Sequence, residues 1–435
     1  MIIDFTIKNY RSFKDASSLS LLAEERLKND GIAITKTAFD DNVLPVAGIF
    51  GQNAGGKSNV IKALAYMTQS LLNTNHINAP INKHPLLQPF LLNRSSREEP
   101  VHFELTIWDS KTTTQYNYGF EVGNSGVELE WLELVDRPQK KRRSRLIFER
   151  KGKKFSFDKT VQARLEPLTI NVLDTALAVN VFGNLAEPIS HRLLELVSPQ
   201  NIKIVDGTDT EQLTHYALNR CFEDKTLQSQ VISIIKKSDI DINDVSIDRT
   251  QMTLKDLPVP EELKPLMAKA SQSSGYNYRI ESQHSVYDDN GNKTNESHSF
   301  NFGDESLGTQ KIFALAVILL DAMNKGETVV FDELGSSLHP FLTKKIVELF
   351  QSTKSNKLGA QLIFTTHETF LLSKNSLNNK LDLRRDQIWL AGKASNETSV
   401  LRCLSEYKTK KEYELAKRYL EGRFGAVPVL KFEES

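Results

Sequence analysis

One eight-residue stretch constrains the fold of this chain more than any other. Residues 51–58 read GQNAGGKS, which matches the phosphate-loop pattern G-x-x-x-x-G-K-[ST]. A short apolar run at 44–50, typical of a strand buried on both faces, comes directly before it. Residues 59–72 follow with apolar positions at helical spacing. The order of strand, glycine-rich loop and helix predicts an α/β fold with an anion site at the start of the helix.

The loop provides several partners for a phosphate chain. We expect its backbone N–H groups to point at phosphate oxygens, Lys57 to bridge the β- and γ-phosphates, and Ser58 to hold Mg²⁺. The predicted cofactors are therefore ATP and Mg²⁺. The predicted nucleotide-binding residues in this stretch are Gly51, Gln52, Asn53, Ala54, Gly55, Gly56, Lys57, Ser58 and Asn59.

Two carboxylates follow a second apolar strand. Residues 328–331 read TVVF and lead into Asp332 and Glu333. In phosphoryl-transfer sites the first such carboxylate supports the Mg²⁺ shell, and a second can polarise the attacking water. We therefore predict Asp332 as a metal-supporting residue beside Ser58, and Glu333 as a catalytic residue.

The rest of the chain shows three other kinds of pattern. Apolar and polar residues alternate across 100–160, which predicts an antiparallel β meander. Residues 189–237 are mostly helical in spacing, and Asp289-Asn290-Gly291 marks a hairpin in the polar stretch 258–300. From Ser306 onward, helices alternate with core strands, as in a parallel sheet.

These patterns predict an α/β chain in four parts. We expect a head with a mixed sheet, interrupted by a β meander and a helical insertion. The parts are 1–100, the first part of the head with the phosphate loop; 101–187, the meander; 188–300, a mostly helical insertion ending in a hairpin; and 301–435, the second part of the head.

Composition excludes some classes of protein. Lys plus Arg and Asp plus Glu both number 55, so a globally basic nucleic-acid coat is excluded. The longest apolar run, at 312–320, is much shorter than the roughly 20 residues of a membrane span. Cys221 and Cys403 lie too far apart in sequence to suggest a disulfide framework or a metal site. We expect a soluble, cytoplasmic protein with no membrane partner.

Four further blocks narrow the class. Residues 9–13 read NYRSF after a strand, 305–310 read ESLGTQ, 336–339 read SSLH, and 361–367 read QLIFTTH. Their order and spacing resemble the ABC-type ATPases of the SMC, RecF and OLD group. The resemblance implies that ESLGTQ is the signature motif, that SSLH is the D-loop and that His367 is the catalytic switch histidine. It also implies that Arg11, Ser306 and Gly308 contact the nucleotide.

Several blocks resemble one bacterial branch, the AAA/ABC-like ATPases of phage-defence loci of the Rlo and abortive-infection type. They are ESLGTQKIFAL, DELGSSLHP, LRRDQIWLA at 383–391 and EGRFGAVP at 421–428. The resemblance covers about 1–75 and 300–430 and is weak across 110–300. Leu307 departs from the small or acidic residue of the signature, and His339 stands where transporter-type D-loops have Asp. The Q-loop glutamine stays open between Gln88 and the stretch 178–184.

In the resembled group, two ATP molecules are held between two heads, so the resemblance implies a homodimer, with a higher oligomer left open. It suggests an ATP-driven switch in antiviral defence that controls an effector encoded nearby, for which a nuclease is one candidate. The alternative is a RecF- or SMC-like ATPase that binds DNA in repair or recombination. A Toprim nuclease within this chain is disfavoured, because no Asp-x-Asp follows His367.

The segment 137–154 holds ten Lys or Arg residues and one acid. It predicts either a contact with nucleic-acid phosphates or a charged hairpin edge that resists pairing with other strands. The sequence leaves both readings open.

Overall fold

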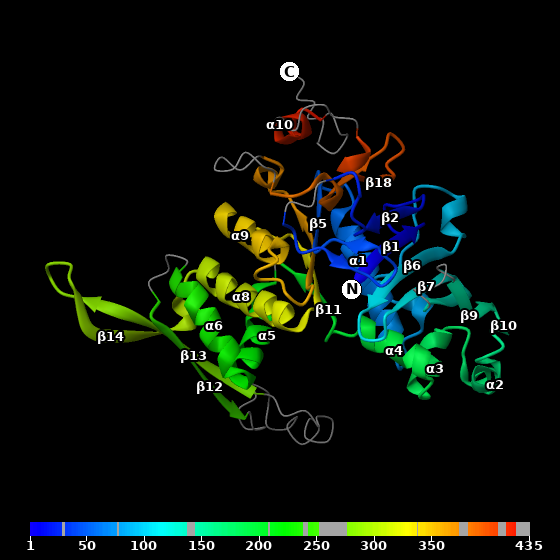
Figure 1. Cartoon of the computed structure of the whole chain (residues 1–435), viewed down its shortest axis with the longest axis horizontal. Coiled ribbons are helices and arrows are strands. Elements are labelled where there is room, and N and C mark those ends of the chain that lie inside the picture. Colours follow the sequence, from blue (N-terminus) through cyan, green and yellow to red (C-terminus); the bar gives the residue numbers. More distant parts are fainter. Residues whose placement is uncertain are drawn as a thin grey trace, which may run out of the picture. The chain divides into compact units, whose positions relative to one another are not determined.

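Short apolar segments separated by helices form a six-stranded sheet in the computed structural model (Figure 1). The sheet has the order β11-β15-β16-β5-β17-β18; the first five strands are parallel, and β18 is antiparallel to β17. Its strands are β5 (Val46–Gly51), β11 (Ile202–Asp206), β15 (Thr328–Asp332), β16 (Gln361–Thr366), β17 (Ile388–Lys393) and β18 (Ser399–Cys403). Every residue of β5 and β16 is buried, as expected for strands covered on both faces. The predicted mixed sheet is confirmed.

A seven-stranded antiparallel sheet has the order β10-β9-β8-β7-β6-β1-β2. It contains the predicted meander and also the N-terminal strand, which pairs with β6. The strands are β1 (Ile2–Lys8), β2 (Ser17–Ser20), β6 (Val101–Asp109), β7 (Thr114–Gly123), β8 (Gly126–Val135), β9 (Ser144–Lys151) and β10 (Lys154–Phe157). Helix α1 (Lys57–Leu72) packs against β1 of this sheet and against β5 and β15 of the six-stranded sheet, so one core joins both sheets.

The structure describes residues 1–27, 31–75, 78–136, 144–207, 209–237, 242–251, 276–336, 338–373, 382–407 and 415–422. The chain divides into a first unit, Met1–Gly207 with Ala322–Ser435, and a second unit, Thr208–Asp321. The boundaries of these two units differ from those of the four parts predicted from the sequence. The four-part division therefore stays a prediction.

The remaining helices of the first unit are short. They are α2 (Gln162–Leu165), α3 (Ala178–Asn184), α4 (Pro188–Val197), α9 (Pro340–Gln351) and α10 (Leu415–Leu420). The two-residue strands β3 (Thr35–Lys36) and β4 (Asn42–Val43) form a small pair. The 3-10 turns among the described residues are η1 (Ile81–Lys83), η2 (Ser95–Arg97), η3 (Glu166–Asn171), η5 (Phe302–Asp304), η6 (Thr369–Leu372), η7 (Arg385–Gln387) and η8 (Leu404–Glu406).

A buried ion pair anchors α3 to the antiparallel sheet. Glu130 and Arg150 are 0% and 1% exposed, and their side chains lie 3.7 Å apart. The carboxylate accepts the backbone N–H groups of Ala178 and Val179 at 2.7 and 2.9 Å. Tyr118 donates its hydroxyl to the same carboxylate at 3.0 Å. These bonds satisfy a buried charge that would otherwise destabilise the fold.

The second unit combines helices with a three-stranded sheet. Its elements are α5 (Thr210–Glu223), α6 (Lys225–Lys237), β12 (Asp244–Gln251), β13 (Tyr276–Tyr287), β14 (Lys293–Asn301) and most of α8 (Leu307–Lys325). The predicted hairpin at Asp289-Asn290-Gly291 is confirmed, with Gly291 at φ 79° in the turn between β13 and β14. Arg220 of α5 donates two hydrogen bonds to the carboxylate of Asp321 on α8, at 2.8 and 3.1 Å.

Helix α8 is the one described helix long and apolar enough to cross a membrane, judged by length and composition. Of its most apolar stretch, 56% is buried inside the protein. The core helix of a soluble protein has the same properties.

Two strands of the six-stranded sheet were absent from the sequence prediction. β18 follows β17, and β11 falls within 188–300, where a mostly helical insertion was expected. β11 pairs with β15 and belongs to the first unit. Five residues between two helices are too few to show a strand period, which explains the miss.

Candidate nucleotide-binding site

The backbone of the phosphate loop lies very close to the backbone of the neighbouring strand β17. Gly51, at φ 154°, could not carry a side chain, because a Cβ there would lie 2.0 Å from the carbonyl oxygen of Ala391. A Cβ on Gly55 would lie 2.8 Å from the same oxygen. Gly56 has φ 107°, in the left-handed region that favours glycine, and ends the loop directly before α1. The glycines therefore allow close approach of backbone to backbone.

Helix α1 begins at Lys57 without a side-chain cap among the described residues. Its first N–H groups are thus available to an anion at the point where the helix dipole is positive. This is the geometry expected for residues 51–59 in phosphate binding, although the roles of the individual loop residues stay predictions.

Lys57 is held over its own loop. Its side chain is buried, with the residue 6% exposed, and Nζ donates to the carbonyl oxygens of Gly51 and Gln52 at 2.9 and 3.1 Å. Burial lowers the pKa of Lys57 to about 8, and the nearby charges of Glu333 and Asp332 counteract part of that effect. The amine is therefore positioned beside both predicted carboxylates.

A hydroxyl from the loop reaches the predicted metal-supporting carboxylate. Ser58 Oγ donates to Asp332 Oδ1 at 3.1 Å, which joins the start of α1 to the end of β15. A serine hydroxyl and a carboxylate are oxygen ligands of the kind that Mg²⁺ prefers, usually completed by water and phosphate oxygens. Among the described residues no cluster of three His, Cys, Asp or Glu forms a competing metal site. The residues present fit Mg²⁺.

The chain turns sharply after Asp332. Glu333 has φ 59°, in the left-handed region that non-glycine residues seldom adopt. Its backbone N–H donates to Thr365 Oγ1 at 2.8 Å, and its carbonyl oxygen accepts the N–H of Ser336 at 3.2 Å. Gly207, at the end of β11, donates its N–H to the carbonyl oxygen of Asp332 at 2.9 Å. Contacts from two neighbouring strands thus fix the acidic turn.

His367 directly follows β16 at the same edge of the sheet. Desolvation lowers the pKa of its imidazole, the charge of Lys57 acts in the same direction, and Glu333 and Asp332 oppose it. The charges of all three predicted site residues therefore affect the pKa of the imidazole. Ligands of parallel α/β sheets bind beyond the carboxyl ends of the strands, where these residues lie.

The N-terminal turn lies beside the start of α1. Ser12 Oγ accepts a hydrogen bond from Asn59 at 2.7 Å, and the Ser12 carbonyl accepts the N–H of Ser399 at 2.6 Å. Arg11, at φ 50°, donates its guanidinium to the Leu86 carbonyl at 3.3 Å and to the Tyr10 hydroxyl at 3.1 Å. Arg11 is thus held by residues near the loop, and its contact with nucleotide stays a prediction.

The structure favours one of the two Q-loop candidates. The Arg11 N–H donates to the Gln88 carbonyl at 2.7 Å, which places Gln88 next to the N-terminal turn. Helix α3, the other candidate, lies at the far end of α1, because Asn180 donates to the Leu71 carbonyl at 2.6 Å. Leu71 is about 21 Å along the helix from Lys57 at 1.5 Å per residue. Gln88 is therefore the candidate nearer to the start of α1, and its role as the Q-loop glutamine stays a prediction.

Ser306 and Gly308 belong to the second unit, whereas the phosphate loop belongs to the first, and their contact with nucleotide stays a prediction. Ser306 Oγ caps α8 by accepting the N–H of Thr309 at 3.1 Å. Ser306 itself is exposed, and Leu307 is 70% exposed. The start of the predicted signature helix therefore faces solvent in the single chain.

Glu305 braces that helix start from the sheet of the second unit. Its carboxylate accepts a hydrogen bond from Ser282 and contacts His284 Nε2 at 2.7 Å, both on β13. Gln310 donates back to the Glu305 carbonyl at 2.9 Å. The residue before Ser306 is thus fixed to β13.

The predicted D-loop is described in part. Ser337 lies outside the described residues. His339 caps α9 by accepting the N–H of Phe341 at 3.3 Å, and its ring stacks on Phe341, which is 71% exposed.

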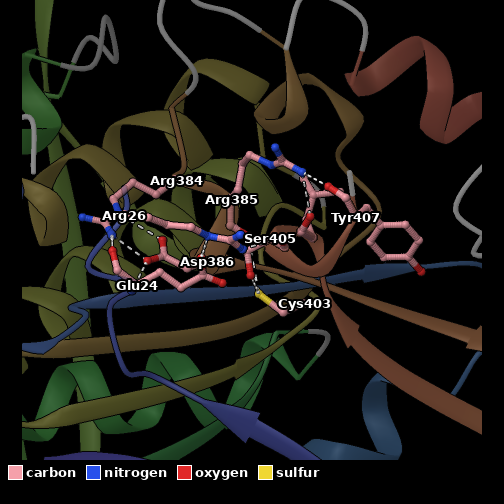
Figure 2. A network of polar contacts seen from close by, with 9 residues as sticks. Glu24, Arg26, Arg384, Arg385, Asp386, Cys403, Ser405 and Tyr407 are labelled. Atoms are coloured by element: carbon pink, nitrogen blue, oxygen red, sulfur yellow. Dashed lines mark hydrogen bonds and ion pairs between the residues drawn. The ribbon is translucent and has the colours of Figure 1, made fainter. Parts of the chain in front are cut away.

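The block at 383–391 supports the strand beneath the loop. Figure 2 shows Arg384 directed at Asp386, to which it donates at 2.6 and 2.9 Å. Asp386 also accepts the N–H of Glu24 at 2.9 Å, and Arg26 donates to the Ser405 carbonyl at 2.8 Å. This network fixes the entry to β17, whose Ala391 lies against the loop. The block at 421–428 falls mostly outside the described residues.

The basic segment 137–154 contributes residues both to the edge of the antiparallel sheet and to the buried core. Residues 137–143 lie outside the described residues, while β9 and β10 form the expected hairpin, with β10 at the edge of the sheet. Arg150 points inward and donates to the carbonyls of Ala176 and Leu173 at 2.7 and 3.0 Å. That arginine serves the core and is not available to a phosphate.

Sequence reasoning missed Thr365 and Gly207, which contact the acidic pair from neighbouring strands. The signal for Thr365 was present. Two threonines end a strand that is otherwise apolar, directly before His367.

Comparison with known proteins identifies a family for this chain. A family model described as "AAA domain, putative AbiEii toxin, Type IV TA system" matches residues 46–373. No curated protein matches the chain. The solved structures with detectable similarity include the SMC head domain from Thermotoga maritima, with 12% identity, a TM-score of 0.40, and coverage of 92% of this chain and 98% of that chain. An SMC head bound to the C-winged helix domain of ScpA has 12% identity, a TM-score of 0.36, and coverage of 92% and 96%.

At such low identities and TM-scores, the structural similarities carry no functional information. The family match is different, because it spans well over half of the 435 residues and includes the phosphate loop, the acidic pair and His367. The chain therefore belongs to this AAA-domain family of P-loop ATPases, which confirms the resemblance to the abortive-infection type.

Proposed function

We propose that the protein binds and hydrolyses ATP with Mg²⁺ and acts as a nucleotide-driven switch between open and closed head dimers. The observation that carries the proposal is the hydrogen bond from Ser58 to Asp332. It joins the phosphate-binding helix to the acidic turn, so that one edge of the sheet holds phosphate, metal and base functions together.

Each residue at this edge has a role that follows from its position. Lys57 supplies a positive charge to the β- and γ-phosphates after leaving the carbonyls of its own loop. Ser58 and Asp332 hold Mg²⁺, which neutralises charge on the phosphates when it is bound. Glu333 accepts a proton from the attacking water, and His367, kept neutral by its lowered pKa, donates a hydrogen bond to the γ-phosphate.

The dimer in this proposal forms a composite site. Ser306 and Gly308 start an exposed helix whose N-terminus favours an anion, and an exposed Leu307 lies between them. In the resembled ABC-type group, the signature of one head caps the nucleotide held by the other. The exposed helix start supports the same arrangement here, because it is open to a nucleotide held by a partner chain.

The proposed biological role is that of an ATPase subunit in antiviral defence. It is supported by the resemblance to ATPases of phage-defence loci and by the family description, which names a putative AbiEii toxin of a type IV TA system. The chain would act in the cytoplasm, without a membrane partner, on an effector encoded nearby, with a nuclease as one candidate. The alternative, a RecF- or SMC-like ATPase on DNA, predicts ATP-dependent DNA binding by the purified protein.

Mixing two inactive variants tests the composite site. Ser306→Arg blocks the signature sterically, and Lys57→Ala removes the phosphate-binding charge. In a mixed dimer, one site carries both lesions and the other carries neither. The intact site combines the loop of the Ser306→Arg chain with the signature of the Lys57→Ala chain. Each variant alone should be inactive, and the mixture should recover ATPase activity.

A matched control is Ser229→Arg, which places the same side chain on an exposed serine of α6 in the same unit. It should retain wild-type turnover. No recovery in heterodimers confirmed by native mass spectrometry would refute the shared geometry. Full activity of Ser306→Arg alone would remove ESLGTQ from the active site.

A further inference from the structure

One buried hydroxyl contacts both residues of the acidic pair. Thr365 is the fifth residue of β16 and is 0% exposed. Its Oγ1 lies 2.6 Å from Asp332 Oδ1 and 2.8 Å from the backbone nitrogen of Glu333. A single side chain from the neighbouring strand therefore links the predicted metal-supporting carboxylate to the predicted base.

The direction of these two hydrogen bonds is fixed by chemistry. The Glu333 N–H can only donate, so the Thr365 hydroxyl accepts there. Its one proton is then available to Asp332, whose ionised carboxylate can only accept. Ser58 donates to the same oxygen of Asp332 at 3.1 Å. Two hydroxyls thus fix the rotation of this carboxylate through Oδ1.

The second hydrogen bond holds an unusual backbone. Glu333 has φ 59°, a conformation that carries strain in a residue other than glycine. The bond from its N–H to Thr365 holds the turn at the point where the side chain of Glu333 leaves the strand. Threonine is branched at Cβ and stiff at χ1, so the hydroxyl is kept in place.

We propose that Thr365 is a positioning residue that aligns Asp332 for Mg²⁺ and Glu333 for the attacking water. The proposal rests on the ATPase function proposed above and gives a role to a residue of the 361–367 block that had none. Within the described part of the chain, the Thr365 hydroxyl bonds to Asp332 and Glu333, and not to the phosphate loop or to Lys57. Its removal should therefore affect metal use and turnover, while leaving the affinity for metal-free ATP unchanged.

The test compares Thr365→Val with Thr365→Ser. Valine keeps the shape and removes the hydroxyl, whereas serine keeps the hydroxyl. Hydrogen bonds to charged groups are strong enough that the Mg²⁺ concentration for half-maximal ATPase activity should rise about 10–100-fold in Thr365→Val. Thr365→Ser should restore it to within about 3-fold of wild type. ATP affinity measured by calorimetry in EDTA should be the same in all three proteins.

A second readout does not depend on turnover. Mn²⁺ bound with a non-hydrolysable ATP analogue should give an electron paramagnetic resonance spectrum altered in Thr365→Val and normal in Thr365→Ser. The matched control is Thr343→Val, because Thr343 is buried in the same unit and its hydroxyl has no hydrogen-bond partner among the residues that the structure describes. That control should behave as wild type in every measurement.

Two outcomes would overturn the positioning role. The first is that Thr365→Val has the Mg²⁺ requirement and the turnover of wild type. The second is that Thr365→Val loses as much ATP affinity, measured in EDTA, as it loses turnover, which would indicate a packing role. If Thr365→Val does not fold, Thr365→Cys replaces it in the test, because the S–H group is a weaker donor than the hydroxyl. Thr365→Cys should need a higher Mg²⁺ concentration for half-maximal ATPase activity than wild type. The same Mg²⁺ concentration as wild type would refute the role. Failure of wild type to bind or hydrolyse ATP would refute the proposed function instead.

Discussion

Replacing Lys57 with methionine should abolish nucleotide binding and yet stabilise the free protein. Lys57 is 6% exposed, and burial lowers its pKa from 10.5 to about 8. A change of that size corresponds to about 3 kcal/mol against the charged amine at pH 7. Methionine has a similar length and no charge, so the folded state would no longer bear this cost.

Two hydrogen bonds act in the opposite direction. Nζ donates to the carbonyls of Gly51 and Gln52, and such bonds contribute about 1 kcal/mol each to stability. The expected net gain for Lys57→Met is therefore about 1 kcal/mol at pH 7. The loss of ATP binding should exceed it, because the phosphates lose their buried positive partner.

The stability difference should depend on pH with a defined sign. The pKa of Lys57 is lower in the folded state than in the unfolded state. The unfolded wild-type chain thus binds more protons between about pH 8 and pH 10.5, and wild-type stability rises with pH across that range. Lys57→Met lacks this titration. Its advantage should be complete below about pH 8 and should shrink as the pH approaches 10.5.

Urea unfolding without nucleotide at pH 7 and pH 9.5 measures the difference, and calorimetry measures ATP affinity. Lys62→Met is the matched control, because Lys62 is exposed on the same helix. It should change neither quantity. A Lys57→Met protein that is less stable than wild type at pH 7, or whose advantage is the same at both pH values, would refute the reasoning.

Three further predictions follow from the same site. Glu333→Gln should bind ATP without hydrolysing it and accumulate as a closed dimer, detected by light scattering; hydrolysis at the normal rate would identify another base. His367→Ala should lower turnover far more than ATP affinity, and because the pKa of His367 is lowered, wild-type activity should not vary with its ionisation between pH 7 and 8; equal losses in rate and affinity would indicate packing. Neutralising the basic residues at 140–143 should lower the log–log salt slope of nucleic-acid binding by about 0.7–0.9 per lost contact if they bind phosphates. Increased aggregation with unchanged affinity would instead indicate a protected edge.

The sequence was sufficient for elements with a strong local pattern. The strand β5, the loop and α1 were predicted because buried strands, glycines and helical spacing each leave a clear signal. The partner of β1 could not be predicted in the same way. Phe5 pairs with Leu105, about a hundred residues away, and antiparallel pairing at that distance leaves no local trace. β11 was missed because its short apolar run lies between helices.

The residues of the candidate site also separate into those with a local sequence pattern and those placed by distant strand pairing. Lys57, Ser58, Asp332 and Glu333 were predicted as site residues because motifs have fixed spacing along the chain, and their roles stay predictions. Thr365 and Gly207 were not found, because they act by touching the acidic turn from strands that are distant in sequence. Motif spacing identifies residues that contact a ligand, whereas the residues that orient them depend on sheet order, and sheet order was only partly predictable.

The hydrogen bonds of Lys57 and Ser58 bear on how the proposed switch would work. Lys57 donates to two loop carbonyls and Ser58 donates to Asp332, so a phosphate or a metal that binds these groups has to replace those hydrogen bonds. A buried polar group that exchanges one partner for another avoids the cost of being left unpaired. In the proposed switch, such an exchange would let ATP binding and hydrolysis shift the equilibrium between open and closed dimers in either direction.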